Sequence, residues 1–320
     1  MSTTQNAATR LHRARSGVGV GGSGRPGRGR NVIAAQTRRT YSALIIPSLV
    51  LLVLINAYPF VVAASQSVHD GSLISEGAYV GFDNYVTVLT SEAFWKATRF
   101  TLIFTVVGVF GSWVLGLAFA LLLRTRIPGN GVFKVLLLLP WVVPVVVSAT
   151  AWNWLVATPQ SPVPSLLRLF GIENVLFLAD PTLAAITVCV FKVWISFPFM
   201  MMMAASALAA VDPTVYEASQ MDGASKWQQF RMITLPLIAR STYISWILMT
   251  IFCVNDFPTI YLLTGGGPVD ATTSLTVLAY RTVFQDFQLG PGVAIAFMMT
   301  LALVVVSVVL YRQIRKSSVE

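Results

Sequence analysis

One stretch of the chain decides its fold class. Residues 101–123 read TLIFTVVGVFGSWVLGLAFALLL, with no charged side chain in the run. A helix needs about 20 consecutive apolar residues to cross the hydrocarbon core of a bilayer. Because a helix satisfies its own backbone hydrogen bonds, it can lie in lipid without a hydrogen-bonding partner. The stretch therefore predicts a transmembrane helix.

Five more apolar runs of similar length lie on either side of this stretch. They cover residues 41–65, 135–155, 183–208, 242–263 and 293–311. The chain is 55% hydrophobic and only 11% charged, whereas soluble domains carry about 25% charged residues. The sequence predicts an all-α, polytopic membrane protein with six transmembrane helices. Cys189 and Cys253 lie inside apolar runs, which disfavours a disulfide or a metal site.

The distribution of Lys and Arg predicts the orientation of the spans. An excess of these residues marks the cytoplasmic side of a membrane protein. Between and after the spans, one side collects Arg124, Arg126, Lys134, Lys226, Arg231, Arg240, Arg312, Arg315 and Lys316. The N-terminal tail lies on the same side and carries eight arginines before Tyr41. Both termini are therefore expected in the cytoplasm.

The N-terminal tail, residues 1–40, is basic and rich in Gly and Ser, and it has no acidic residue. This composition predicts a disordered cytoplasmic tail ahead of a transmembrane domain at residues 41–320. The tail lacks the interleaved aromatic residues that stack on bases, so contact with lipid is favoured over nucleic-acid binding. Nothing in the first forty residues resembles a cleavable signal peptide.

The loop at residues 209–237 carries strong helix-end signals. Residues 212–236 read DPTVYEASQMDGASKWQQFRMITLP. Asp212 can cap a helix that starts at Pro213, and Gly223 suits the left-handed conformation that ends one. Ser225 with Gln228 predicts a capping box for a second helix. That second helix is expected to stop at Pro236, so the loop is predicted to form a helix, a sharp turn and a helix.

The first helix of this loop is too short to span a bilayer and too polar to lie buried in lipid. Val215, Ala218 and Met221 recur at intervals of three residues, while Glu217 and Asp222 point elsewhere. A short, rigid, exposed helix can dock into a groove on a partner. The alternative is an ordinary amphipathic loop lying on the membrane surface. Periodicity alone leaves both interpretations open.

The same loop resembles the EAA signature of binding-protein-dependent ABC importer permeases. The matching pattern is Glu217-Ala218-Ser219, three residues, Gly223, nine residues, Ile233, one residue, then Leu235-Pro236. The one departure is Ser219, where the family usually has Ala. In the family this segment is the coupling helix, which a cleft on a separate ATPase subunit receives. The resemblance implies coupling roles for Tyr216, Glu217, Ala218, Ser219, Met221, Asp222 and Gly223.

Two further segments are similar to sugar permeases of this family. They are Gly81-Phe82-Asp83-Asn84-Tyr85 followed by Phe94-Trp95, and the LTGGGP segment at residues 263–268. The second is typical of the first permease subunit of maltose and glycerol-phosphate importers. The resemblance implies a type I ABC importer transmembrane domain in the bacterial cytoplasmic membrane. It also implies a second permease, a homodimeric cytoplasmic ATPase and an extracytoplasmic sugar-binding protein as partners.

The chain is expected to be a transport subunit rather than an enzyme. It contains no G-x-x-x-x-G-K-[ST] segment, the motif that cradles nucleotide phosphates in many ATPases. ATP and Mg²⁺ are therefore expected on the partner ATPase, and no cofactor is expected on this chain. The predicted substrate is a disaccharide or oligosaccharide such as maltose or trehalose. The alternatives are glycerol-3-phosphate import and an ion-coupled secondary transporter.

Polar side chains at membrane depth are candidates for the substrate path, because burying them in lipid is unfavourable. They are Lys192, Trp194, Ser196, Asn255 and Asp256. By resemblance these two stretches line the path in sugar permeases, and Asn255 fits a sugar-contacting position best. Lys192 and Asp256 either contact substrate or pair with each other and neutralise a buried charge. In an ion-coupled transporter the same two residues would carry the coupling.

Overall fold

The structure is a computed structural model that describes residues 28–75, 77–125 and 128–317. It divides into two compact units, residues 1–61 and 62–320. The described residues form helices and, apart from one isolated bridge between His69 and Tyr79, no β-structure. The helices are α1 Arg28–Gln66, α2 Asp83–Thr90, α3 Glu92–Leu122, α4 Asn130–Val142, α5 Val145–Val156, α6 Pro162–Arg168, α7 Pro181–Ala209, α8 Pro213–Met221, α9 Lys226–Gln229, the π-helix η1 Phe230–Thr234, α10 Leu235–Val254, α11 Pro258–Thr264, α12 Leu275–Phe284 and α13 Leu289–Ser317. The predicted all-α class is confirmed.

Five of the described helical segments are long and apolar enough to cross a bilayer: Ala43–Gln66, Glu92–Leu122, Pro181–Ala209, Lys226–Val254 and Leu289–Arg312. The sixth candidate is the pair α4 and α5, which bends by 93° between its two halves. The predicted apolar runs are thus all helical. The third and fifth, however, are interrupted.

The first apolar run lies within α1, which begins at Arg28 rather than at Tyr41. The prediction of disorder is therefore wrong for residues 28–40, and residues 1–27 lie outside the described part of the chain. Adding residues to a helix that already exists is far easier than starting one. Ala34 and Ala35 favour helix and sit next to the apolar run, so the helix extends toward the N-terminus through them.

Pro144 explains the bend in the third apolar run. A proline disfavours the helical conformation in the residue before it, and Val143 is extended, with φ −67° and ψ 132°. The helix therefore ends at Val142, and α5 starts afresh at Val145. Pro140 lies within α4 without ending it.

The fifth run was predicted as one span over residues 242–263, and the structure corrects this. The helix α10 ends at Val254, and the short α11 starts at Pro258. Pro258 has no N–H to donate to the preceding turn. The Asp256 carboxylate accepts the Thr259 N–H at 3.0 Å and so caps the new helix instead.

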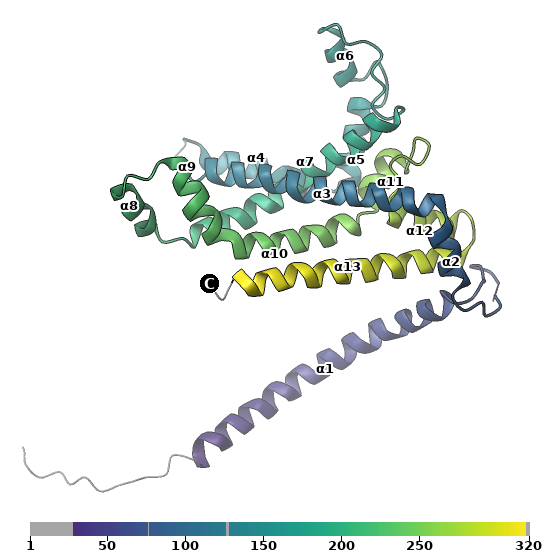
Figure 1. The fold of residues 1–320 in the computed structure, drawn as a ribbon, viewed down its shortest axis with the longest axis horizontal. Coiled ribbons are helices and arrows are strands. Elements are labelled where there is room, and N and C mark those ends of the chain that lie inside the picture. The colour runs from purple at the N-terminus through teal and green to yellow at the C-terminus, as the bar shows by residue number, and fades with distance from the viewer. Residues whose placement is uncertain (1–27, 76, 126–127, 318–320) are drawn as a thin grey trace, which may run out of the picture. The chain divides into compact units, whose positions relative to one another are not determined.

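Within residues 62–320, α3 packs along α7, and α10 contacts α3, α7 and α13 (Figure 1). Small residues on α3 allow the close approach to α7, as in many membrane helix pairs. A Cβ atom on Gly116 would lie 2.6 Å from the Met201 backbone nitrogen. The buried core between these helices contains Phe104, Phe191 and Met249.

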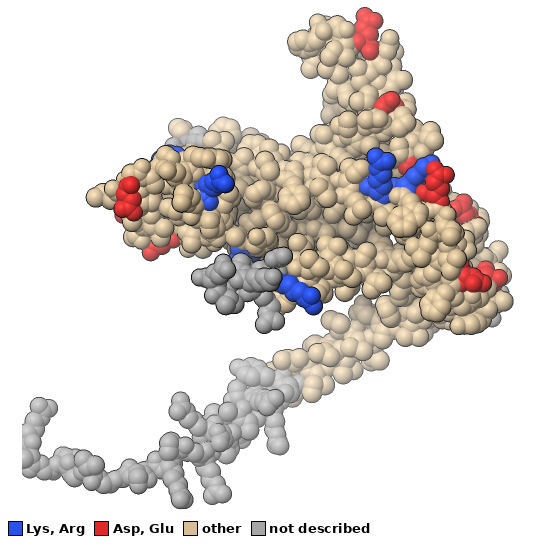
Figure 2. Space-filling model, viewed as in Figure 1, with Lys and Arg blue, Asp and Glu red and all other residues tan. Residues whose placement is uncertain are grey.

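Charged side chains gather toward the two ends of this bundle. Figure 2 shows Lys, Arg, Asp and Glu over α8 and α9 at one end and over α2, α3 and α12 at the other, with a largely uncharged stretch between. This is the pattern that a membrane bundle needs, since charged groups in hydrocarbon are unfavourable. The loop that contains α8 and α9 therefore lies at one polar end of the bundle.

Candidate functional site

The start of α8 is fixed by a side-chain cap, as predicted. Asp212 Oδ1 accepts the Thr214 N–H at 2.9 Å, and Pro213 follows as the first helical residue. This hydrogen bond favours the ionised carboxylate, so the Thr214 backbone lowers the pKa of Asp212 below its usual value. The α8 helix therefore begins at a defined residue.

The end of α8 is equally well defined. Gly223 has φ 77°, in the left-handed region. The Ala224 N–H donates to the Ser219 carbonyl and the Gly223 N–H to the Gln220 carbonyl, each at 3.0 Å. This pair of hydrogen bonds is a Schellman motif. The predicted sharp turn at Gly223 is confirmed.

The capping box at the start of α9 is also present. The Ser225 N–H donates to Gln228 Oε1 at 2.7 Å, and the Gln228 N–H donates to Ser225 Oγ at 3.3 Å. With the caps of α8, it fixes the helix–turn–helix geometry of the loop through local hydrogen bonds.

The prediction that Pro236 stops the second helix is wrong. The chain continues from α9 through η1 into α10, and Pro236 lies in the first turn of α10. The Leu235 N–H donates to the Phe230 carbonyl five residues back, the pattern of a π-helix. The wider turn accommodates the proline ring, which would press on the preceding turn of a regular α-helix. The loop is therefore joined to α10 without a break.

Tyr216 holds the inner face of α8 against the bundle. Its hydroxyl lies 3.1 Å from Thr234 Oγ1 in η1, and the Arg124 guanidinium lies 4.7 Å from the centre of its ring. Ser219 is buried beside it and donates from Oγ to the Tyr216 carbonyl at 2.8 Å. The sequence reasoning missed Arg124 and Thr234 as site residues, because only the fold brings them to Tyr216.

The outer face of α8 is apolar and exposed. Val215 is 40% exposed and Met221 is 90% exposed, and Ala218 lies between them on the same face. Glu217 and Asp222 are also exposed, and neither forms an ion pair within the described part of the chain. The residues implied by the EAA resemblance therefore divide into an inward set, Tyr216 and Ser219, and an outward set.

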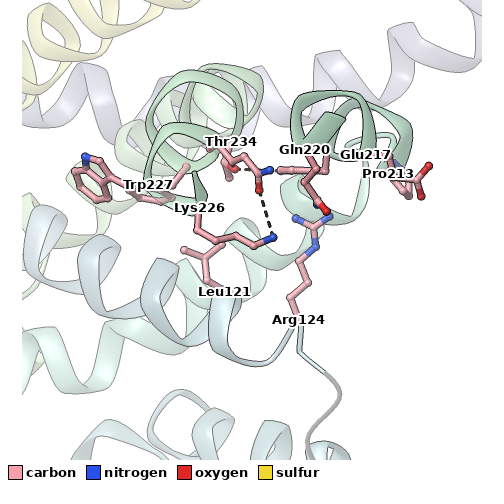
Figure 3. Close-up of a pocket in the computed structure, with 11 residues that line it drawn as sticks. Leu121, Arg124, Pro213, Glu217, Gln220, Lys226, Trp227 and Thr234 are labelled. Atoms are coloured by element: carbon pink, nitrogen blue, oxygen red, sulfur yellow. Dashed lines mark hydrogen bonds between the residues drawn. The ribbon is translucent and has the colours of Figure 1, made fainter. Parts of the chain in front are cut away.

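An open groove of about 640 Å³ lies between α8, α9 and the end of α3. Figure 3 shows Arg124 and Lys226 on one side of it and Glu217 and Gln220 on the other. Lys226 Nζ donates to Gln229 Oε1 at 3.5 Å. The groove offers an apolar floor with polar groups of both charges at its rim.

At membrane depth the structure pairs Lys192 with Asp256. Lys192 Nζ lies 2.6 Å from Asp256 Oδ2, and each side chain is 7% exposed. Lys192 comes from the middle of α7, and Asp256 comes from the break between α10 and α11. Of the two alternatives left open for these residues, the pairing is the arrangement seen in the structure.

The remaining candidates lie around this pair without joining it. Trp194 lies 5.5 Å from Trp152, centre to centre, and stacks on Phe191. Asn255 is exposed, and its amide donates to the Ile251 carbonyl at 2.9 Å. Ser196 is buried, and its Oγ has no hydrogen-bond partner within the described residues. The exposed amide of Asn255 and the half-buried ring of Trp194 remain accessible to a ligand.

Comparisons with known proteins agree with this geometry. Residues 112–318 match the family of binding-protein-dependent transport system inner membrane components. The trehalose/maltose transport system permease protein MalF of Thermococcus litoralis is 35% identical over 266 residues, 82% of this chain and 90% of that protein. The sulfoquinovosyl glycerol transport system permease protein SmoG of Agrobacterium fabrum is 31% identical over 274 residues, 85% of this chain and 89% of that protein.

A solved structure shares the fold. The crystal structure of a bacterial ABC transporter that imports the acidic polysaccharide alginate superposes with a TM-score of 0.76, over 90% of this chain and 99% of that one, at 20% identity. An identity this low supports the fold alone, whereas the family rests on the sequence matches. The match covers α7 to α13, including the capped loop and the Lys192–Asp256 pair. The chain belongs to the family of binding-protein-dependent transport system inner membrane components.

Proposed function

We propose that this chain is a permease subunit of an ATP-driven, binding-protein-dependent sugar importer, and that α8 couples it to a separate ATPase. The observation that carries the proposal is the geometry of α8. The helix is capped at both ends and presents an apolar outer face that includes Val215 and Met221. An exposed apolar helix face of this kind suits a groove on a partner protein.

The contacts of α8 support transmission of movement into the spans. Tyr216 joins α8 to η1 through Thr234, and η1 continues directly into α10. Arg124, just after the end of α3, lies over the same tyrosine ring. A displacement of α8 by the ATPase would therefore act on α10 and α3 together. Such rigid contacts are the physical means by which a distant site responds to a docked partner.

The substrate class is inferred from the relatives and from the site. The permeases named above serve trehalose/maltose and sulfoquinovosyl glycerol systems. In this chain, an exposed amide at Asn255 and an indole at Trp194 suit a hydroxyl-rich ligand, which needs hydrogen-bond partners and an aromatic surface. A disaccharide or oligosaccharide fits these groups.

The proposed assembly contains a second permease, a cytoplasmic ATPase homodimer and an extracytoplasmic sugar-binding protein. It lies in the bacterial cytoplasmic membrane with both termini in the cytoplasm. On this chain, Glu217, Ala218, Asp222 and Gly223 complete the docking surface of α8. ATP and Mg²⁺ act on the partner ATPase, and this subunit supplies the path and the coupling.

The test is sugar-stimulated ATP hydrolysis by the reconstituted complex with variants of the outer face of α8. Val215→Asp and Met221→Asp each place a charge where an apolar contact is proposed. Both sites are exposed, so the fold should be retained. The matched control is Val269→Asp, on an exposed residue in the loop between α11 and α12.

The two α8 variants should lose sugar stimulation and release the ATPase on purification, while Val269→Asp retains the ATPase. Full stimulation and full ATPase retention in both α8 variants would disprove the coupling role. A complex that responds to none of a panel of sugars would disprove the substrate class.

A further inference from the structure

The charged side chains of the spans are unevenly placed. In the described parts of the helices most of them lie near the ends, such as Glu92, Lys96 and Arg99 in the first turns of α3. Arg240 is exposed in the second turn of α10. Lys192, by contrast, is about 16 Å along α7 from its first residue, at 1.5 Å per residue. It pairs with Asp256, so these two residues supply the charge in the middle of the bundle.

This pair is closed to other partners. The Lys192–Asp256 contact is 2.6 Å long, and both side chains are almost fully buried. The second oxygen of Asp256 accepts the Thr259 N–H at 3.0 Å. The ammonium group lies 5.8 Å from the centre of the Phe104 ring, which also favours its charge. The cation is therefore already neutralised before any substrate arrives.

Packing around the pair holds it in place. A Cβ atom on Gly108 of α3 would lie 3.2 Å from Lys192 Cγ and 2.8 Å from Cys253 Sγ. The aliphatic part of Lys192 is thus enclosed by α3 and α10. Moving the ammonium group toward a different anion would require these tightly packed helices to shift.

We infer that the substrate carried past this subunit is an uncharged sugar, and that Asp256 determines this selection by occupying Lys192. The inference rests on the sugar-import function proposed above. A phosphate, sulfonate or carboxylate on the substrate would have to displace Asp256 from Lys192, which would leave a buried carboxylate without a cation. Breaking a buried pair in this way disfavours the complex by a factor of about 10² to 10³ or more.

The inference goes beyond the comparisons, because they leave the charge of the substrate open. The structural neighbour imports an acidic polysaccharide, whereas the trehalose/maltose permease is named for neutral sugars. It also excludes glycerol-3-phosphate, which the sequence left as an alternative. Asp256 is a specificity residue in this account, acting through Lys192.

The experiment compares matched neutral and anionic substrates in the complete reconstituted complex. ATP hydrolysis is measured with trehalose and trehalose 6-phosphate, and with glycerol and glycerol-3-phosphate, each over a concentration series. The variants are Asp256→Asn, which leaves Lys192 without its counter-ion, and the neutral double variant Lys192→Met/Asp256→Asn. Glu92→Gln is the matched control, because it frees Lys96 from an exposed pair at the end of α3. The same binding protein is present in every arm, so a difference between variants reports on the permease.

The wild-type complex should respond to a neutral sugar at least 100-fold better than to its phosphate ester. Asp256→Asn should raise the ratio of anionic to neutral response at least tenfold, and neither Glu92→Gln nor the double variant should change it. A wild-type response to a phosphorylated substrate equal to the neutral one would overturn the inference and leave sugar import standing. So would a preference for neutral sugar that Asp256→Asn leaves unchanged in an assembled complex. Silence toward every sugar would instead count against the proposed function.

Discussion

The Lys192–Asp256 pair gives a sharp prediction for stability. Lys192→Met removes the cation and leaves the Asp256 carboxylate in a site where it is 7% exposed. Removing one partner of a buried ion pair typically destabilises a protein by about 3–5 kcal/mol. Asp256→Asn should be less severe, because the Asn oxygen can still accept the Thr259 N–H and a long Lys side chain can move its charge toward water.

The double variant distinguishes the pair from ordinary packing. Lys192→Met/Asp256→Asn contains no buried charge, so its stability should return to within about 1 kcal/mol of wild type. The coupling energy of the cycle is then about 2–4 kcal/mol, whereas independent sites add. The assay is thermal unfolding of the purified permease in nanodiscs, with chemical denaturation as a second probe. If the two single effects simply add in the double variant, the ion pair does not stabilise the bundle and the reasoning is refuted.

Three further predictions concern packing and the loop. Gly116→Leu should lower the unfolding temperature through about 1–3 kcal/mol of overpacking between α3 and α7, while Gly131→Leu, which has no atom within 4 Å of its Cβ position, should not. Gly223→Val should abolish sugar-stimulated ATP hydrolysis because φ is 77° there, and Gly223→Asn should retain it, since Asn tolerates this region; equal activities would refute the role of the turn. The Asp212 cap has a lowered pKa, so its stabilisation is present above the pKa of the unfolded chain, about 3.9, and is lost as the pH falls through the lower folded value. Hydrogen exchange at Thr214 should therefore accelerate more in acid, relative to its intrinsic rate, in wild type than in Asp212→Asn, and identical pH profiles would contradict this.

Local signals in the sequence were enough to predict the capped loop. Asp212, Gly223 and the Ser225–Gln228 box act through hydrogen bonds to residues two to five positions away, which the sequence order already brings together. The apolar runs were predictable for a similar reason, because bilayer thickness fixes their length. The same reasoning failed at Pro236, where one π-helical turn accommodates the ring within a continuing helix. Composition does not reveal such a turn.

Contacts between distant segments could not be predicted as geometry. The sequence placed Lys192 and Asp256 at membrane depth but left open whether they pair, because the answer depends on how α7 meets the α10–α11 break. Tyr216 was predicted as a coupling residue by resemblance, yet its contacts with Arg124 and Thr234 depend on the end of α3 reaching the loop. The breaks at Val143 and after Val254 lie next to prolines, but a proline does not by itself distinguish a kink from an end.

The most direct test of the central claim is the energy source of transport. Proteoliposomes that contain the full complex would be assayed for uptake of a labelled neutral sugar, with ATP supplied on the side that bears α8 and ionophores present to collapse proton and sodium gradients. The account predicts uptake that requires ATP, persists with the ionophores and is lost in Met221→Asp. Uptake that proceeds without ATP and stops when the ion gradients collapse would contradict it.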